Sequence, residues 1–228
     1  MALSGEIGGT VIDPVCLGPC TLGEDCQFDP GVYLAYPCGT PKCRRRNSFE
    51  ETILGRGCVV RSHSVIYRHS SLGDGCHVAH NVVVREHATL GAGCVLGIGT
   101  VIREGACLGR NVRLMEHVVI CEDAELGDDI FVGPGVTFVA SRHMPGALLA
   151  AGTISDDEAG RREGLYYYEA PTVRVGNGVR IGAGSVVFPG LSLGEGSVIA
   201  AGSVVSQSIG PHLLAAGNPA RPIKRVKS

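Results

Sequence analysis

The sequence lacks the features that would place it in several common classes of protein. Its 228 residues include no tryptophan and only 5% aromatic residues, so its core must consist of small and aliphatic side chains. No segment approaches the roughly 18 apolar residues of a membrane-spanning helix, and the first residues form neither a basic segment nor an apolar leader. The 20 basic and 22 acidic residues nearly cancel, which gives no bulk reason to expect a nucleic-acid partner. We therefore expect a cytoplasmic protein that binds neither nucleic acid nor membrane.

Glycine, cysteine and aliphatic residues are abundant instead. The 34 glycines accompany 44% hydrophobic residues and a mean hydropathy of +0.20, so the chain can bury a core and is not disordered. The 10 cysteines need another explanation than disulfides, because structural disulfides are rare in the cytoplasm.

An apolar residue recurs at every sixth position. The series is Leu54, Val60, Ile66, Leu72, Val78, Val84, Leu90, Leu96, Ile102, Leu108, Leu114, Ile120, Leu126, Val132 and Phe138, and it resumes at Val175, Ile181, Val187, Leu193, Ile199 and Val205. A six-residue period would spread apolar residues around a helix, whereas short parallel strands separated by tight turns satisfy it. The residue after each apolar position is often glycine, which we attribute to turns that need positive φ.

This period predicts an all-β solenoid, a parallel β-helix. Three six-residue sides make one 18-residue coil, so residues 18 apart stack at about 4.8 Å. We expect one β-helix domain over residues 1–210, with an irregular loop at 37–47 and a long external loop at 139–171. Residues 211–228 form a tail that closes the solenoid.

The most regular cysteines are spaced by one coil. Cys58, Cys76 and Cys94 occupy the small inward position, which predicts a buried column of small hydrophobic side chains. A zinc site there is the alternative, but no close pattern of paired ligands accompanies it, and we expect no metal. Another metal site is conceivable among the less regular cysteines, which are Cys16, Cys20, Cys26, Cys38 and Cys43.

The C-terminal third carries the most specific motifs. Residues 199–206 (IAAGSVVS) and 217–224 (GNPARPIK) resemble the closing segments of hexapeptide-repeat acyltransferases, and 171–184 (PTVRVGNGVRIGAG) resembles their re-entry after an external loop. The branches most similar are the nucleotide-sugar and amino-sugar enzymes and the galactoside and xenobiotic acetyltransferases. The resemblance implies a left-handed coil, a homotrimer, and acetyl transfer from acetyl-CoA to an amine or hydroxyl of a sugar or nucleotide-linked sugar.

The same resemblance implies the positions that contact the cofactor. They are Ala183, Ala201, Ser206, Gln207, Arg221 and Lys224. Where the family often has Thr-Lys, this chain has Ser206 and Gln207, which puts one phosphate contact in doubt. Arginine and lysine suit the phosphates of CoA because they form charge-assisted pairs.

Acyl transfer needs a base near the acceptor, and histidine suits this role. The segment around His80 resembles the base of the lipid A pathway acyltransferase, with Asn81 in place of the acid and Glu116 as a distant substitute. The segment ending at His143 resembles that around the base of the galactoside enzymes, so the two histidines stay alternatives, followed by His117.

Three further residues are candidates for substrate binding because they lie in segments similar to the amino-sugar branch. Asn111 matches an asparagine that faces substrate there, although asparagine is also an ordinary turn residue. Arg85 and Glu86 follow His80 in the other similar segment.

Two other functions fit the same repeat. A zinc enzyme of the gamma carbonic anhydrase type would need histidines in a spacing that Arg85 and His87 do not match. A non-catalytic binding or assembly module fits the repeat equally well, but the long loop and the motif at 217–224 favour an enzyme.

Overall fold

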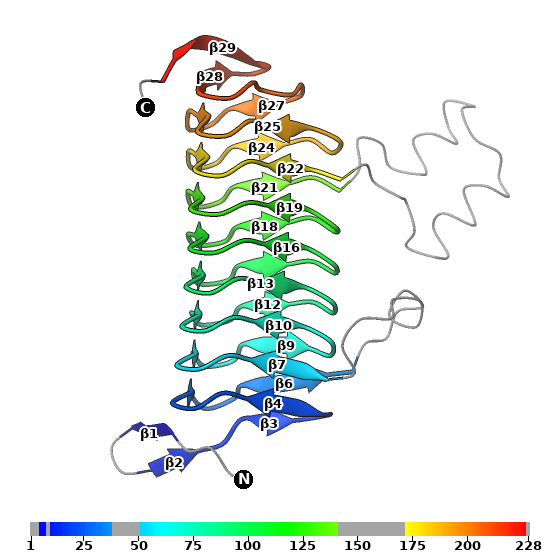
Figure 1. The fold of residues 1–228 in the computed structure, drawn as a ribbon, viewed down its shortest axis with the longest axis vertical. Coiled ribbons are helices and arrows are strands. Elements are labelled where there is room, and N and C mark those ends of the chain that lie inside the picture. Colours follow the sequence, from blue (N-terminus) through cyan, green and yellow to red (C-terminus); the bar gives the residue numbers. More distant parts are fainter. Residues whose placement is uncertain (1–4, 8–9, 38–50, 141–171, 227–228) are drawn as a thin grey trace, which may run out of the picture.

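A computed structural model describes residues 5–7, 10–37, 51–140 and 172–226, with side chains from residue 13 onward. These segments contain strands and turns and no helix, so none of them includes a helix that could cross a membrane. Figure 1 shows the strands stacked along one long axis, from β3 (Val15–Cys16) near one end to β29 (Ala220–Arg225) at the other. The predicted parallel β-helix is therefore confirmed.

The described strands form three parallel sheets, which we call the first, second and third faces in the order in which the chain visits them. The first face contains β4 (Cys20–Leu22), β7 (Thr52–Leu54), β10 (Ser71–Leu72), β13 (Thr89–Leu90), β16 (Cys107–Leu108), β19 (Glu125–Leu126), β22 (Arg174–Val175) and β25 (Ser192–Leu193).

The second face contains β5 (Gln27–Phe28), β8 (Val59–Val60), β11 (His77–Val78), β14 (Val95–Leu96), β17 (Arg113–Leu114), β20 (Phe131–Val132), β23 (Arg180–Ile181), β26 (Val198–Ile199), β28 (Leu213–Gly217) and β29 (Ala220–Arg225). The third face contains β3 (Val15–Cys16), β6 (Tyr33–Tyr36), β9 (Val65–Tyr67), β12 (Val83–Val84), β15 (Val101–Ile102), β18 (Val119–Ile120), β21 (Thr137–Phe138), β24 (Val186–Val187) and β27 (Val204–Val205).

Two hairpins differ from this parallel pattern. The pair β1 (Gly5–Ile7) and β2 (Thr10–Ile12) is antiparallel and lies at the N-terminal end. At the other end, β28 pairs in parallel with β26 and antiparallel with β29, so the tail extends the second face.

The turns define three corners, which we number after the face that precedes each. The first corner joins the first face to the second, the second corner joins the second to the third, and the third corner returns to the first. The 18-residue register survives the long insertion, since Leu126 on β19 pairs with Val175 on β22. The six-residue series of apolar residues is buried throughout and forms one continuous core.

Positive φ occurs at a different position of the repeat from the one we predicted. It falls three residues after the apolar residue, as at Gly57 after Leu54 and Gly75 after Leu72. Histidine, asparagine and aspartate occupy many of these turns, and these residue types tolerate positive φ better than most. The non-glycine examples include Asp25, His63, His69, Asn81, His87, Asn111, His117, Asp123, Asp129 and His212.

The glycines directly after the apolar positions have another cause. At the first corner they form a column that consists of Gly23, Gly55, Gly73, Gly91, Gly109, Gly127, Gly176 and Gly194. A Cβ atom at any of them would lie 2.4–3.0 Å from a backbone atom of the next coil. Close stacking of the coils, and not positive φ, therefore excludes a side chain from this glycine column.

The buried cysteine column is confirmed, and its thiols do more than fill space. The thiols of Cys58, Cys76 and Cys94 donate to the carbonyls of Gly73, Gly91 and Gly109, with Sγ–O distances of 3.2, 3.3 and 3.2 Å. Cys26 extends the series at 3.1 Å to Gly55. Each thiol therefore links its own coil to the glycine column of the next.

Candidate functional site

The second corner brings together several of the predicted catalytic and cofactor residues. Its backbone forms a ladder in which one residue per coil accepts a hydrogen bond from the next coil. These acceptors are Ser62, His80, Ile98, Glu116, Pro134 and Ala183, and Ala201 occupies the same position on the following coil; we call all seven the corner line. Residues from positions 62 to 201 therefore share a single edge of the molecule.

His80 is exposed on this line and has a defined partner. Its Nδ1 atom lies 2.7 Å from Ser62 Oγ on the preceding coil. If the Nδ1 proton is donated to Ser62, Nε2 becomes a free acceptor, which a general base needs. Ser62 was not among the predicted site residues, although its spacing of 18 from His80 indicates that the two residues stack on adjacent coils.

Glu116 and His117 lie two coils further along the same corner. Glu116 is half-buried on the corner line, and His117 is an exposed turn residue with φ of 56°. The imidazole of His117 covers Gly99, where an added Cβ would be 2.5 Å from Nδ1. One coil spans about 4.8 Å, so Glu116 lies about 10 Å along the corner line from both His80 and Ala183. Asn81, which replaces the family's acid, is an exposed turn residue.

The predicted cofactor residues divide into two groups. Ala183 and Ala201 are exposed on the corner line, and beyond them the chain turns from β28 into β29. Arg221 and Lys224 lie on β29, are exposed, and pair with Ala216 and Leu214 of β28. Ser206 and Gln207 instead follow β27 at the third corner, so the structure does not bring them to this line.

Arg85 and Glu86 also lie at the third corner, away from His80. The guanidinium of Arg85 donates to both carboxylate oxygens of Glu86, at 2.7 and 2.9 Å, and lies 5.0 Å from the centre of the Tyr67 ring. Glu86 is completely buried, and this pairing raises the pKa of Arg85 above its usual range. Both side chains are engaged with the protein itself.

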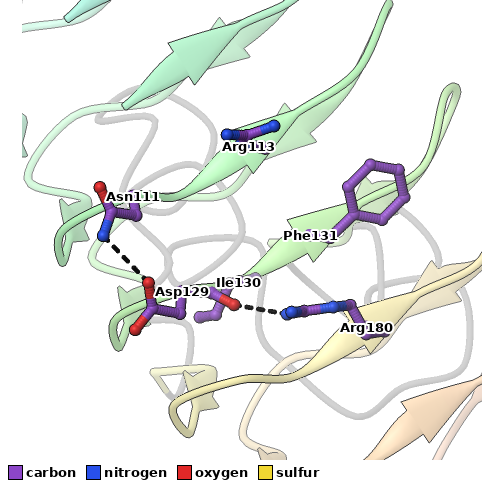
Figure 2. Close-up of a pocket in the computed structure, with 6 residues that line it drawn as sticks. All are labelled: Asn111, Arg113, Asp129, Ile130, Phe131 and Arg180. Atoms are coloured by element: carbon purple, nitrogen blue, oxygen red, sulfur yellow. Dashed lines mark hydrogen bonds between the residues drawn. The ribbon is translucent and has the colours of Figure 1, made fainter. Parts of the chain in front are cut away.

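A hollow of about 520 Å³ opens where the first corner meets the second face (Figure 2). Its lining residues are Asn111, Arg113, Asp129, Ile130, Phe131 and Arg180. The amide of Asn111 donates from Nδ2 to Asp129 Oδ1 at 3.0 Å, and Arg180 donates to the main-chain oxygen of Asp129. The structure thus places Asn111 in a pocket, with its amide group holding a neighbouring carboxylate.

Several predictions fall outside the described residues. His143, the external loop from residue 141 onward, most of the loop at 37–47, Cys38 and Cys43 belong to this group. Among the residues that are described, no three or more histidine, cysteine, aspartate or glutamate side chains are grouped to hold a metal ion. The eight described cysteines are all free thiols.

The comparison with protein families agrees with the repeat seen in the structure. Residues 172–207 match the family described as the hexapeptide repeat of succinyl-transferase. This segment of the chain is therefore similar to the hexapeptide repeat. The fold of the chain is also that of a UDP-N-acetylglucosamine acyltransferase from Campylobacter jejuni, with a TM-score of 0.60 and 20% identity over 93% of this chain and 73% of that one. This likeness supports the left-handed form of the hexapeptide-repeat coil.

Two relatives extend the comparison. A hexapeptide-repeat acetyltransferase from Vibrio cholerae, solved in complex with acetyl coenzyme A, is 25% identical with a TM-score of 0.50 and covers 62% of this chain and 72% of that one. A Schizosaccharomyces pombe protein with a provisional acetyltransferase name is 33% identical over 102 residues. That match spans 45% of this chain and 43% of the yeast protein.

Proposed function

We propose that this protein is an acetyltransferase that uses acetyl-CoA. The observation that carries the proposal is the corner line, which places the candidate base His80 and the predicted cofactor positions Ala183 and Ala201 on one edge. The Vibrio cholerae relative, which binds acetyl coenzyme A, supports the choice of donor. The acceptor is an amine or hydroxyl of a sugar or nucleotide-linked sugar, as the similarity to the amino-sugar branch implies.

The C-terminal end of the corner line suits an extended thioester cofactor. Ala183 and Ala201 are small and exposed, and the adjacent Gly182 cannot carry a side chain, since its Cβ would lie 2.4 Å from the backbone nitrogen of Ala201. This low surface lets a pantetheine chain approach backbone groups. Arg221 and Lys224 on β29 then supply cations for the phosphates of CoA.

The proposed reaction needs one proton transfer. The base, His80 or His143, takes a proton from the acceptor amine or hydroxyl while the acceptor attacks the thioester carbonyl. A bond forms between the acceptor atom and the acetyl carbon, the carbon–sulfur bond breaks, and the proton passes to the departing CoA sulfur. Ser62 orients the His80 ring in this scheme, and Glu116 and His117 lie nearer to the cofactor end.

We propose that the active assembly is a homotrimer in the cytoplasm. From β9 to β27, the first residue of each third-face strand is half-buried, and all but one of these residues are valine: Val65, Val83, Val101, Val119, Thr137, Val186 and Val204. Covering this continuous apolar strip with a second copy would remove it from water. The free thiols of the described cysteines suit a reducing compartment.

The test measures release of free thiol from acetyl-CoA in the presence of amino sugars and nucleotide-linked amino sugars. His80→Ala should lower kcat/KM by roughly a hundredfold or more if His80 is the base, and Ser62→Ala should lower it less and shift its pH profile. His77→Ala is the matched control, because His77 is an exposed histidine on the adjacent strand β11. Full activity in both His80→Ala and His143→Ala would show that the base assignment is wrong.

Thermal stability separates the enzyme from a non-catalytic module. Acetyl-CoA should raise Tm through preferential binding to the folded chain, and Arg221→Gln should reduce that rise. A protein whose Tm does not respond to acetyl-CoA at millimolar concentration would favour the binding module instead.

A further inference from the structure

We infer that the pocket at the first corner binds a nucleoside diphosphate group, meaning a planar base on a ribose with two linked phosphates. The pocket is defined by Arg113, Phe131 and Arg180 on the second face and by Asn111 and Asp129 at the corner (Figure 2). Its role in a reaction rests on the proposed transferase function. Its binding does not, and can be measured without any reaction.

Phe131 supplies a stacking surface for the base. It is the outward residue of β20 and is 37% exposed. An aromatic side chain that stays exposed on a strand adds little to the stability of the fold by itself. Aromatic side chains that lie open on a sheet are the usual platform for bases, because every base has a π face. Phe28 and Phe138 are buried in the core, whereas Phe131 is exposed and lines the pocket, where a planar ligand can reach its ring.

Two arginines flank this phenylalanine on the neighbouring strands. Arg113 on β17 and Arg180 on β23 are the Cα partners of Phe131 on either side, so their backbones are about 10 Å apart. The side chain of Arg113 is exposed and makes no hydrogen bond or ion pair with any described residue. Arg180 uses Nη1 for the main-chain oxygens of Asp129 and Val179, which leaves Nε and Nη2 available.

This arrangement favours phosphate over an isolated carboxylate. One guanidinium group can donate two parallel hydrogen bonds to two oxygens of a phosphate. The two guanidinium groups, one on each side of β20, therefore match two linked phosphates better than a single small anion. With Asp129 included, the formal charge of the pocket is +1, so an anion is still attracted.

Asn111 and Asp129 complete the pocket with a polar edge. Asn111 donates to Oδ1 of Asp129 at 3.0 Å, which fixes the carboxylate at the corner. The other carboxylate oxygen of Asp129, Oδ2, can accept hydrogen bonds from the hydroxyls of a ribose, which is a common role of acidic residues in nucleotide sites. Base, ribose and phosphates thus each meet a suitable group.

A nucleoside diphosphate could reach this protein from two sources. It is the common end of a nucleotide-linked sugar, the proposed acceptor, and of CoA, the proposed donor. Because the recognised chemistry is the same, the experiment must separate the two.

The test titrates the full chain by calorimetry with UDP, ADP, inorganic pyrophosphate and uridine. Arg113→Gln should weaken binding of both nucleoside diphosphates by about tenfold, as expected for a lost charge-assisted hydrogen bond. Phe131→Ala should weaken the same ligands by roughly tenfold and leave pyrophosphate nearly unchanged. The matched control is Arg174→Gln, which removes an exposed arginine of the first face outside the pocket.

Equal affinities in Arg113→Gln and Arg174→Gln would overturn the proposal, as would a Phe131→Ala variant that binds UDP and ADP like the wild type. Titration with UDP-N-acetylglucosamine and with CoA then identifies the source, since Arg113→Gln should weaken the one that uses the pocket. If Arg113→Gln weakens the binding of neither compound, the pocket binds neither a nucleotide-linked sugar nor CoA.

The two proposals can fail separately. If UDP binds through Arg113 but no acceptor releases thiol from acetyl-CoA, the transferase function fails and the pocket stands. If thiol release occurs and binding ignores Arg113, the pocket fails and the function stands.

Discussion

The glycine column makes a prediction about stability that does not depend on function. In Gly91→Ala, the new Cβ would lie 2.6 Å from the carbonyl carbon of Gly109 and 2.8 Å from the nitrogen of Arg110. Both are backbone atoms, so no side chain can rotate away and the two coils must separate. Overpacking of this kind costs about 1–3 kcal/mol or more, and we expect about 3 kcal/mol here.

Gly75→Ala is the informative comparison because it tests the other class of glycine. Gly75 has φ of +66° and open space around its Cβ position, so alanine meets conformational strain but no collision. That strain is about 1–2 kcal/mol and is partly offset by the loss of freedom in the unfolded chain. Gly75→Asn should cost still less, since asparagine occupies the equivalent turns.

The assay is urea unfolding followed by circular dichroism, with the midpoint converted to a free energy. A loss of about 3 kcal/mol corresponds to a fall in Tm of roughly 6–12 °C for a chain of this size. Ala92→Gly, at the exposed neighbouring position, controls for a local change of backbone flexibility. If Gly91→Ala is no less stable than Gly75→Ala, close stacking is not the reason for the glycine column.

Three further predictions concern a thiol, a buried ion pair and the third face. Burial raises the pKa of Cys121 from 9.0 to about 12, so the unfolded chain loses this proton first, and the free energy of unfolding should fall as pH rises from 9 to 12. The fall from this thiol is about 1.4 kcal/mol at pH 10; urea unfolding should show a shallower fall in Cys121→Val, and an equal one would contradict the account. Arg85→Met leaves the buried carboxylate of Glu86 without its guanidinium and should cost about 3 kcal/mol in the same assay, whereas a loss below about 1 kcal/mol would mean that the pair is not structural. Val101→Lys should dissociate the proposed trimer in light scattering while Val95→Lys, on the second face, should not; equal masses for the two variants would exclude the third face as the interface.

The fold was largely predictable because one six-residue pattern determines both burial and strand position. The residues from Leu54 to Phe138 fall inward at every sixth place, as the apolar series requires. The role of the glycines was not predictable in the same way. Apolar periodicity reports which side chains face inward, but the approach of one coil to the next is visible only in three dimensions.

The candidate site was predictable in its line and not in its contacts. The spacing of 18 places Ser62 and His80 on adjacent coils, yet only the structure shows the 2.7 Å contact between them. The pocket was missed because Phe131 and Arg180 are 49 residues apart and become neighbours only when the long insertion is removed from the count. Arg85 and Glu86 follow His80 closely in the sequence, but they lie at the third corner whereas His80 lies at the second.

The corner line also makes distance along the site a matter of whole coils. Deleting residues 82–99 removes 18 residues and would join Asn81 to Thr100. Thr100 is buried at the same position of the repeat as Val82, one coil later, so it could take the place of Val82. Ala183 would then move about 4.8 Å closer to His80, and Glu116 would lie on the coil directly after it. The number of coils between His80 and Ala183 thus sets the distance between the candidate base and the proposed cofactor end. An acceptor that must span this distance is therefore selected by its length, in steps of one coil.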